Sequence, residues 1–434
     1  MWRMVKVAKG SFLILMLFAL VTCAPGALAQ VEIEVWHSMP AGAATEIWRQ
    51  LVDRFNEQNP DIIVRDINVG GYTTGYEKAV VAWAGGAPPN IMHLEQARNT
   101  TFIDEGLVLP LEPFIEKDPT FPEDDFIPTM RNVFTYDRDG RLYGIPFNTS
   151  TPVNYIRRDL FEQAGLDPDR PPRTWEEILE FSRKLTRDTN NDGDPDTFGT
   201  SFYSWGWMFE AWLGQNGGRV LNEDGTRFLL NSPEAIGMLE FTQKLVHEHR
   251  VADYGGGASY FYVGRVAMTE GSTASLQNHI RQAEDLGYSL GVAPLACNVE
   301  CYAPIGGGGF VIFDTGTAEQ KEASWRFLSY LSSPEVYAEF AKGTGYMVAR
   351  RSAFEELQDY FLEEPRARVT YDQIDYAYPR PQVPFWETMH GYYGKIYQVQ
   401  MVQNGDFRPV LEEATQVGNQ LLAEWLEKRA QRDR

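Results

Sequence analysis

The fold of this chain can be inferred from residues 31–69, which read VEIEVWHSMPAGAATEIWRQLVDRFNEQNPDIIVRDINV. Residues 31–36 place Val31, Ile33 and Val35 on one face, the period-two pattern of a half-buried strand. Apolar residues then recur at helical spacing through residues 47–55, and residues 62–69 predict the next strand. A strand, a helix and a second strand in succession predict the α/β class, with a mostly parallel sheet flanked by helices.

Three later helix starts are marked by their capping residues. Residues 174–177 (TWEE) form a capping box, and residues 232–234 and 333–335 (both SPE) each place a cap before a proline. Gly343 is expected to end the helix that follows the second SPE, and a last helix is expected over roughly 409–429. Because no repeat or low-complexity linker separates these elements, we expect two lobes joined by crossing strands.

The N-terminus is typical of an export signal. Basic residues within 3–9 precede the apolar run 12–21 (FLILMLFALV), and residues 27–29 (ALA) match the small-x-small cleavage pattern. The apolar run is about half the length that a membrane helix needs. We therefore expect residues 1–29 to be a signal peptide and the mature chain to begin at Gln30, in the periplasm or another extracytoplasmic compartment.

The three cysteines leave alternatives open. Cys23 permits a lipid-anchored form, although the threonine before it fits a lipoprotein pattern poorly, and an uncleaved anchor is a third possibility. Cys297 and Cys301 could close a small disulfide loop, which export permits, or remain two free thiols. With no clustered histidines, we expect no metal and no cofactor.

The charge of the chain excludes two classes of partner. The formal net charge is -21, and it becomes about -24 on removal of a leader that holds three basic and no acidic residues. Such a chain is not expected to bind nucleic acid or anionic lipid. An anionic solute would need a local cationic or dipolar site.

Motifs in a fixed order carry a family resemblance. Residues 34–38 (EVWHS) are followed by 55–60 (FNEQNP); residues 85–90 (GGAPPN) precede a short apolar strand; and 344–346 (TGY) follow the second SPE helix. Together they resemble the extracellular solute-binding proteins of bacterial ABC importers, in the carbohydrate group, over essentially the whole mature chain. Within this group the chain is most similar to the members that bind glycerol-3-phosphate, on residues 36–39 (WHSM), 146–153 (PFNTSTPV), 164–168 (AGLDP) and 171–175 (PPRTW).

The resemblance implies a two-lobed periplasmic-binding-protein fold of type II, with hinged lobes and a ligand cleft between them. One lobe would comprise residues 30–148 plus about 303–360. The other would comprise about 149–302 plus about 361–434, with the lobe of the C-terminal helices left open. The resemblance also implies a monomer that takes up a small polyol-phosphate or sugar and delivers it to membrane permease subunits.

The ligand contacts of the family can be placed on this sequence. Glu95 follows an apolar run at the expected carboxyl end of a strand, where ligands of open α/β sheets bind. Residues 306–309 are all glycine, so their backbone N–H groups could approach an anion. Tyr76 is a second choice for the first tyrosine. The predicted ligand-binding residues are Tyr72, Glu95, Ser150, Trp205, Trp207, Ser272, Gly307, Tyr346 and Tyr397.

One departure from the family affects the substrate. The family places an arginine near the final helices, and the matching residues 395–398 read KIYQ, so that Tyr397 or Gln398 takes its place. Glycerol-3-phosphate or a glycerophosphodiester therefore remains one expected solute, and a neutral sugar or oligosaccharide remains the alternative.

Two further patterns have alternative interpretations. Residues 188–196 (DTNNDGDPD) resemble the start of a calcium loop, but the twelfth position is Gly199, so an Asx-rich turn is favoured. A secreted glycosidase or phosphodiesterase is the alternative from another functional class, and a two-lobed sensor is a third. The sequence contains no Gly-x-Ser-x-Gly elbow and no His-Glu-x-x-His motif, so we expect binding without catalysis.

Overall fold

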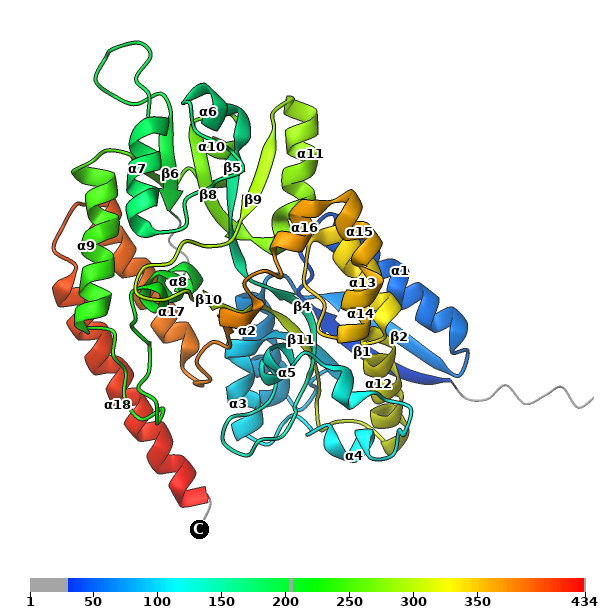
Figure 1. Cartoon of the computed structure of the whole chain (residues 1–434). Coiled ribbons are helices and arrows are strands. Elements are labelled where there is room, and N and C mark those ends of the chain that lie inside the picture. Colours follow the sequence, from blue (N-terminus) through cyan, green and yellow to red (C-terminus); the bar gives the residue numbers. More distant parts are fainter. Residues whose placement is uncertain (1–29, 203–205, 433–434) are drawn as a thin grey trace, which may run out of the picture.

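The computed structural model describes residues 30–202 and 206–432. The expected signal peptide, Cys23 and Trp205 lie outside the described residues. The described chain forms two five-stranded sheets, which lie one above the other in Figure 1, each with helices around it. The α/β prediction is confirmed.

The first sheet has the strand order β2-β1-β3-β11-β4, and its core is aromatic. Trp48 stacks on Phe310 with ring centroids 5.0 Å apart, and Phe147 meets both rings. The strands are β1 (Val31–His37), β2 (Ile62–Asn68), β3 (Ile91–Glu95), β4 (Ile145–Ser150) and β11 (Gly306–Ile312). The helices around this sheet are α1 (Ala43–Gln58), α2 (Tyr72–Ala84), α3 (Asn99–Asp104), α4 (Glu112–Ile115), α5 (Pro128–Asn132), α12 (Ala318–Leu331), α13 (Pro334–Thr344), α14 (Arg351–Glu356), α15 (Gln358–Glu363) and α16 (Pro365–Val369).

The second sheet has the order β7-β6-β8-β5-β9. Its strands are β5 (Pro152–Arg157), β6 (Phe198–Phe202), β7 (Ala252–Tyr254), β8 (Val266–Ser272) and β9 (Leu290–Ala293). The helices that accompany it are α6 (Arg158–Gln163), α7 (Trp175–Leu185), α8 (Gly206–Gln215), α9 (Pro233–His247), α10 (Gly257–Tyr262), α11 (Leu276–Leu286), α17 (Trp386–Tyr397) and α18 (Arg408–Arg432). We call the body around the first sheet the first lobe and the body around the second sheet the second lobe.

Both sheets are mixed, so the prediction of a mostly parallel sheet is wrong. In the first sheet β1 runs parallel to β2 and β3, but β11 runs antiparallel to β3 and β4. In the second sheet β5 runs antiparallel to both of its neighbours. The reason is the crossing of the chain. Strand β11 enters the first sheet at the edge where β3 and β4 end, and β5 enters the second sheet at the edge where β8 and β9 end.

Three segments connect the lobes. The first is Thr151, between β4 and β5. The second follows β9 and contains β10 (Ala303–Pro304), and the third follows α16 and contains β12 (Ala377–Tyr378). Strands β10 and β12 pair in parallel, so the second and third connections run side by side.

The helix starts are as expected. Thr174, Ser232 and Ser333 each accept a hydrogen bond from a backbone N–H in the first turn of α7, α9 and α13. The end of α13 differs from the prediction: the left-handed residue is Gly345, with φ 101°, and Gly343 lies within the helix. The Thr-Gly-Tyr motif is therefore itself the end of this helix, and it turns the chain toward the space between the lobes.

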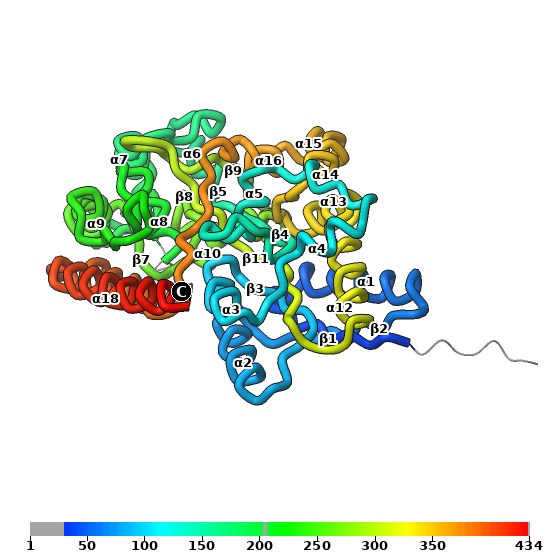
Figure 2. Tube along the Cα trace, turned by 90° about the horizontal axis from the view of Figure 1, so that it is seen from below, coloured from blue at the N-terminus to red at the C-terminus, as the bar shows by residue number. Residues whose placement is uncertain are grey.

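Helix α18 joins the two lobes at one side. It packs against α17 of the second lobe, and its C-terminal end reaches α3 of the first lobe, as Figures 1 and 2 show. There the buried Asp104 carboxylate accepts hydrogen bonds from Trp425 Nε1, from Arg429 and from the Tyr136 hydroxyl. Arg432 also pairs with Glu105 at 2.7 Å.

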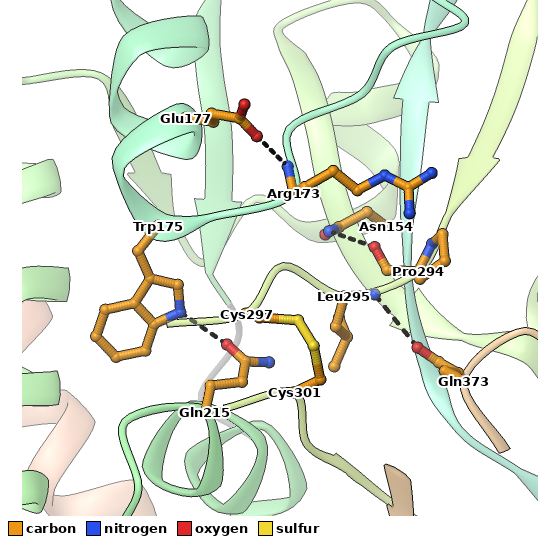
Figure 3. Close-up of a disulfide and its surroundings, with 10 residues drawn as sticks. All are labelled: Asn154, Arg173, Trp175, Glu177, Gln215, Pro294, Leu295, Cys297, Cys301 and Gln373. Carbon is orange, nitrogen blue, oxygen red and sulfur yellow. Dashed lines mark hydrogen bonds between the residues drawn. A yellow bond between two sulfur atoms is a disulfide. The ribbon is translucent and has the colours of Figure 1, made fainter. Parts of the chain in front are cut away.

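Cys297 and Cys301 form a disulfide, which Figure 3 shows with its surroundings. The loop that it closes is fixed on both sides, because the Cys297 N–H donates to Arg173 O at 2.9 Å and the Val299 N–H donates to Gln215 O at 2.9 Å. The Gln215 side chain in turn accepts from Trp175 Nε1. The disulfide therefore anchors the start of the connection that leads through β10 into β11.

Residues 188–196 form the Asx-rich turn that was favoured. Backbone N–H groups farther along the loop donate hydrogen bonds to the side chains of Asp188, Asn190 and Asp192. The Asp196 carboxylate accepts hydrogen bonds from the backbone N–H and from the hydroxyl of Thr189. These oxygens therefore serve the local backbone. No helix within residues 30–202 and 206–432 is long and apolar enough to cross a membrane.

Candidate functional site: a cavity between the lobes

Seven of the nine predicted ligand-binding residues line one cavity between the lobes. Its volume is about 360 Å³, in the range of pockets that hold small molecules. The predicted residues in its lining are Tyr72, Glu95, Ser150, Trp207, Ser272, Gly307 and Tyr346, and the other lining residues are Gly306, Arg380 and His390.

Strand ends position the residues of the first lobe. Glu95 and Ser150 are the last residues of β3 and β4, and Gly306 is the first residue of β11, so all three lie at the edge of the sheet that faces the second lobe. Tyr72 is the first residue of α2, and Tyr346 follows the left-handed turn at the end of α13. The cavity thus lies at the sheet edge where ligands of α/β proteins bind.

Gly307 is required by the backbone at this edge. Its φ is 85°, and a Cβ atom there would lie 1.9 Å from the carbonyl oxygen of Asn148 on the neighbouring strand. The sheet register shifts between Gly308 and Gly309, which is a bulge directly beside the cavity. The glycine run therefore permits a close approach of two strands at the cavity wall.

The second lobe contributes a tryptophan and a serine. Trp207 lies in the first turn of α8, and its Nε1 donates to Pro304 O at 2.9 Å. Because this N–H is already bonded to Pro304, the part of Trp207 that a ligand can contact is the face of its ring. Ser272 ends β8, and its Oγ accepts from the Ala274 N–H at 3.2 Å. The Ser272 oxygen therefore accepts a hydrogen bond from the backbone, and its own O–H can donate to a ligand.

Arg380 is the centre of a buried charge network. Its guanidinium donates to both oxygens of Glu210, at 2.9 and 3.1 Å, and also to Glu95. Arg98 pairs with the other oxygen of Glu95 and with Glu387. Glu95 was predicted to contact the ligand, but two arginines already occupy its oxygens.

The network contains three carboxylates and two arginines, so its formal charge is negative. Burial raises the pKa of Glu210, and the contact with Arg380 opposes this rise. Burial also lowers the pKa of Arg98, opposed by Glu387. Partial burial and the nearby charges of Arg380 and Arg98 lower the pKa of His390, so this cavity residue is neutral at pH 7.

Tyr397 does not line the cavity, so this prediction is corrected. It lies at the end of α17, is 1% exposed, and stacks on Tyr254 with ring centroids 6.5 Å apart. Its side chain thus packs into the core of the second lobe, while Gln398 is exposed. Tyr76, the second choice for the first tyrosine, also lies outside the lining, and its hydroxyl donates to Thr101 at 3.1 Å.

The arginine of the cavity is Arg380, which sequence reasoning missed. It lies in residues 379–382 (PRPQ), after β12, where no helical or strand periodicity places it. The available signal was a single arginine between two prolines in a segment that crosses between lobes. The sequence suggested that Tyr397 or Gln398 replaces the arginine of the family. The cavity nevertheless keeps a positively charged side chain, because Arg380 lines it.

Comparisons with known proteins agree with this architecture. Residues 41–338 match the model of the family described as bacterial extracellular solute-binding protein. The chain belongs to the bacterial extracellular solute-binding proteins. It is 30% identical over 425 residues to the sn-glycerol-3-phosphate-binding periplasmic protein of Salmonella paratyphi A, covering 91% of this chain and 93% of that protein. The corresponding protein of Yersinia pseudotuberculosis is 29% identical over 408 residues, covering 90% and 89%.

Solved structures show the same two-lobed fold. UgpB from Mycobacterium tuberculosis in complex with glycerophosphocholine superposes with a TM-score of 0.80 at 23% identity, covering 91% of this chain and 99% of that one. An ABC substrate-binding protein from Listeria monocytogenes in complex with cycloalternan gives the same TM-score, identity and coverage. The chain therefore has the two-lobed fold that the resemblance implied.

Proposed function

We propose that this solute-binding protein captures a glycerophosphodiester in the cavity between its lobes and delivers it unchanged to the permease subunits of its importer. The observation that carries the proposal is the composition of the cavity. Hydroxyl groups from Tyr72, Ser272 and Tyr346, the backbone at Gly307 and the guanidinium of Arg380 surround a space of about 360 Å³. Hydroxyl, amide and arginine donors are the groups that bind phosphate and polyol oxygens.

Arg380 supports a phosphate-containing solute. Its guanidinium has five N–H donors, and three of them are used by Glu95 and Glu210. The remaining donors can bind a phosphate oxygen without breaking the ion pairs. Related proteins of Salmonella and Yersinia are named for sn-glycerol-3-phosphate binding, and UgpB of Mycobacterium tuberculosis has been solved with glycerophosphocholine.

The charge of the network favours a diester over a monoester. Arg98 and Arg380 face three carboxylates, Glu95, Glu210 and Glu387, so the buried network carries no excess positive charge. A phosphate monoester brings close to two negative charges at pH 7, whereas a phosphodiester brings one. The singly charged group costs less to bury beside this network.

The proposed mechanism is closure of two lobes around the solute. The two bodies that close are the first lobe, which extends through α16 to Val369, and the second lobe, with the paired strands β10 and β12 at the hinge. Delivery requires export, so we also propose that residues 1–29 are removed and that Gln30 becomes the N-terminus. Intact-mass analysis of the exported chain would detect this terminus, and a lipid-modified Cys23 would contradict it.

Isothermal titration calorimetry of the mature chain tests the substrate class. We expect glycerophosphocholine to bind with a Kd in the micromolar range or below, and glycerol-3-phosphate to bind at least about tenfold more weakly because of its extra charge. Phosphorus NMR of the released solute should show it chemically unchanged. Hydrolysis of the solute during the titration would overturn the binding-only proposal and favour a secreted phosphodiesterase.

A neutral sugar is the second candidate, and one observation favours it. Trp207 has used its N–H on Pro304, and the ring that remains can cover the C–H face of a sugar. The same titration with maltose and trehalose decides between the candidates. Binding of either sugar without binding of glycerophosphocholine would replace the phosphodiester by a sugar.

A further inference from the structure

Asn148 is fully buried in β4, directly behind the cavity wall, and does not itself line the cavity. Its Oδ1 lies 3.0 Å from the Gly308 N–H and 2.7 Å from His93 Nε2. Its Nδ2 lies 2.9 Å from the hydroxyl of Tyr72. Asn148 therefore connects a strand of the first sheet to a tyrosine of the cavity.

A backbone group fixes which way this amide points. The Gly308 N–H can only donate, so the atom that faces it must be the oxygen of Asn148. The amide nitrogen then faces Tyr72, and an amide nitrogen can only donate. The oxygen of the Tyr72 hydroxyl must accept that hydrogen bond.

His93 fixes the same direction independently. The Ser38 N–H donates to His93 Nδ1 at 3.3 Å, so Nδ1 carries no proton and Nε2 must carry it. That Nε2–H donates to Asn148 Oδ1. Burial lowers the pKa of His93 to about 3, so the ring is neutral and this tautomer is retained at neutral pH.

The direction of the Asn148 amide determines where the hydroxyl proton of Tyr72 can point. The Tyr72 oxygen accepts from Asn148, so its own proton is left to point away from the amide. Burial raises the pKa of Tyr346, and the nearby Asn148 side chain opposes that rise. Burial likewise raises the pKa of Tyr72, and both tyrosines keep their protons at any physiological pH.

We propose that Asn148 is a positioning residue that directs the hydroxyl proton of Tyr72 into the cavity, so that this wall donates a hydrogen bond and selects an acceptor group on the solute. A phosphate oxygen can only accept and matches such a wall. A sugar hydroxyl can donate or accept and is indifferent to its polarity. The inference rests on the proposed function, because it assigns the phosphate of the solute to this tyrosine.

Asn148→Asp and Asn148→Leu separate orientation from structural support. The carboxylate of Asn148→Asp keeps the shape of the amide and still accepts from His93 and Gly308, but it also accepts a hydrogen bond from the Tyr72 hydroxyl, so that the lone pairs of Tyr72 face the solute. Asn148→Leu removes every hydrogen bond of the side chain and leaves the Tyr72 hydroxyl free to turn. We expect glycerophosphocholine to bind at least about thirtyfold more weakly to Asn148→Asp, and only about three- to tenfold more weakly to Asn148→Leu.

The pH profile of Asn148→Asp provides a second readout. A protonated carboxyl can donate to Tyr72 again, so the affinity of this variant should recover as the pH is lowered, whereas Asn148→Leu should show no such recovery. In a Tyr72→Phe background, Asn148→Asp should change affinity by less than about threefold, because the hydroxyl that it reorients is gone. A larger loss for Asn148→Leu than for Asn148→Asp, with no dependence on pH, would overturn the proposal.

Neutron diffraction from crystals of the unliganded wild-type protein in D2O tests the inference without any ligand or variant. The expected nuclear density has deuterium on His93 Nε2 but not on Nδ1, and the Tyr72 hydroxyl deuterium directed into the cavity. A Tyr72 deuterium directed at Asn148 would overturn the inference, even if Asn148→Asp fails to fold. If the wild-type chain binds no phosphodiester, the proposed function fails on its own, and the neutron result still decides the orientation of the Tyr72 hydroxyl.

Discussion

The two walls of the cavity are built on different physical principles. One wall consists of Tyr72, Gly307 and Tyr346, which are neutral, and hydrogen bonds through Asn148 and His93 hold Tyr72 from behind. The other wall is built on Arg380, which is held by the buried carboxylates of Glu210 in the second lobe and Glu95 at the end of β3. The first wall depends on close packing of strands, whereas the second depends on the balance of buried charges.

The difference separates two kinds of selectivity. A wall of oriented neutral groups distinguishes acceptors from donors and keeps the same hydrogen bonds across the physiological range of pH. A wall supported by buried ionisable groups distinguishes charges, and its stability changes with pH because protons bind differently in the folded and unfolded states. Substitutions at the two walls should therefore differ in how the loss of folding stability depends on pH.

The largest expected effect is that of Arg380→Met. This change leaves Glu210 and Glu95 without Arg380 in a buried site, so the free energy of unfolding should fall by about 3–5 kcal/mol at pH 7. Urea denaturation monitored by tryptophan fluorescence measures the loss. The deficit should shrink as the pH falls toward 5, because protonated carboxyls no longer need a cation.

Arg250→Met is the matched control. Arg250 pairs with Asp194 at 2.6 Å, but both side chains are exposed, so the stability should change by about 0.5 kcal/mol or less. Equal losses for the two variants would show that Arg380 is not the support of the second wall.

Gly307→Ala should break the first wall. The added Cβ would lie 1.9 Å from the Asn148 carbonyl oxygen, at a φ of 85°, and should lower the free energy of unfolding by about 2–4 kcal/mol through strain and forced displacement of β4. Unlike Arg380→Met, this loss should be the same at pH 5 and pH 8. The control is Gly394→Ala in α17, where a Cβ would meet nothing within 4 Å and should be neutral or slightly stabilising.

Glu270→Gln sharpens the contrast in pH dependence. Glu270 lies in β8 of the second lobe, where burial raises its pKa to about 8, opposed in part by Trp212. Between pH 4.5 and about 8 the folded chain holds a proton that the unfolded chain has released, so stability should fall as the pH rises through this window. The wild-type chain should lose about 3–4 kcal/mol between pH 5 and pH 8 from this group.

In Glu270→Gln this part of the pH dependence should disappear, and thermal unfolding at pH 5, 6, 7 and 8 measures it. A variant whose melting temperature follows the same pH curve as the wild type would show that Glu270 does not titrate in the folded chain.

The smallest expected effect is that of the disulfide. Replacing Cys297 and Cys301 together by serine should lower the free energy of unfolding by about 1–2 kcal/mol, because the closed loop is short. Hydrogen bonds to Arg173 and Gln215 remain to hold the loop. Affinity for the solute should change by less than about threefold, and a loss comparable to that of Gly307→Ala would mean that the loop controls the cavity directly.

The two walls also differ in how well they can be predicted from the sequence. Tyr72, Ser150, Gly307 and Tyr346 lie at strand or helix ends inside ordered local motifs, so a resemblance places them directly. Arg380 was missed because its role depends on Glu95 and Glu210, which are distant in the sequence and come together only after the chain has crossed between lobes.

Two errors of prediction have the same origin. Tyr397 was expected in the cavity, but the end of α17 directs this side chain toward Tyr254 in β7. The antiparallel direction of β11 was not expected, because periodicity identifies a strand without showing the edge at which it enters the sheet. Local patterns predicted the elements, whereas the contacts between lobes required the three-dimensional arrangement.

The most direct test of the account is a crystal structure of the mature chain with glycerophosphocholine. The account predicts solute density in the cavity between the lobes, with phosphate oxygens within hydrogen-bond distance of Tyr72, Tyr346 and Arg380. A second cavity of about 1060 Å³, lined by Tyr302 and Tyr378, lies on another side of Arg380. Solute density in that cavity, with the smaller one empty, would contradict the account.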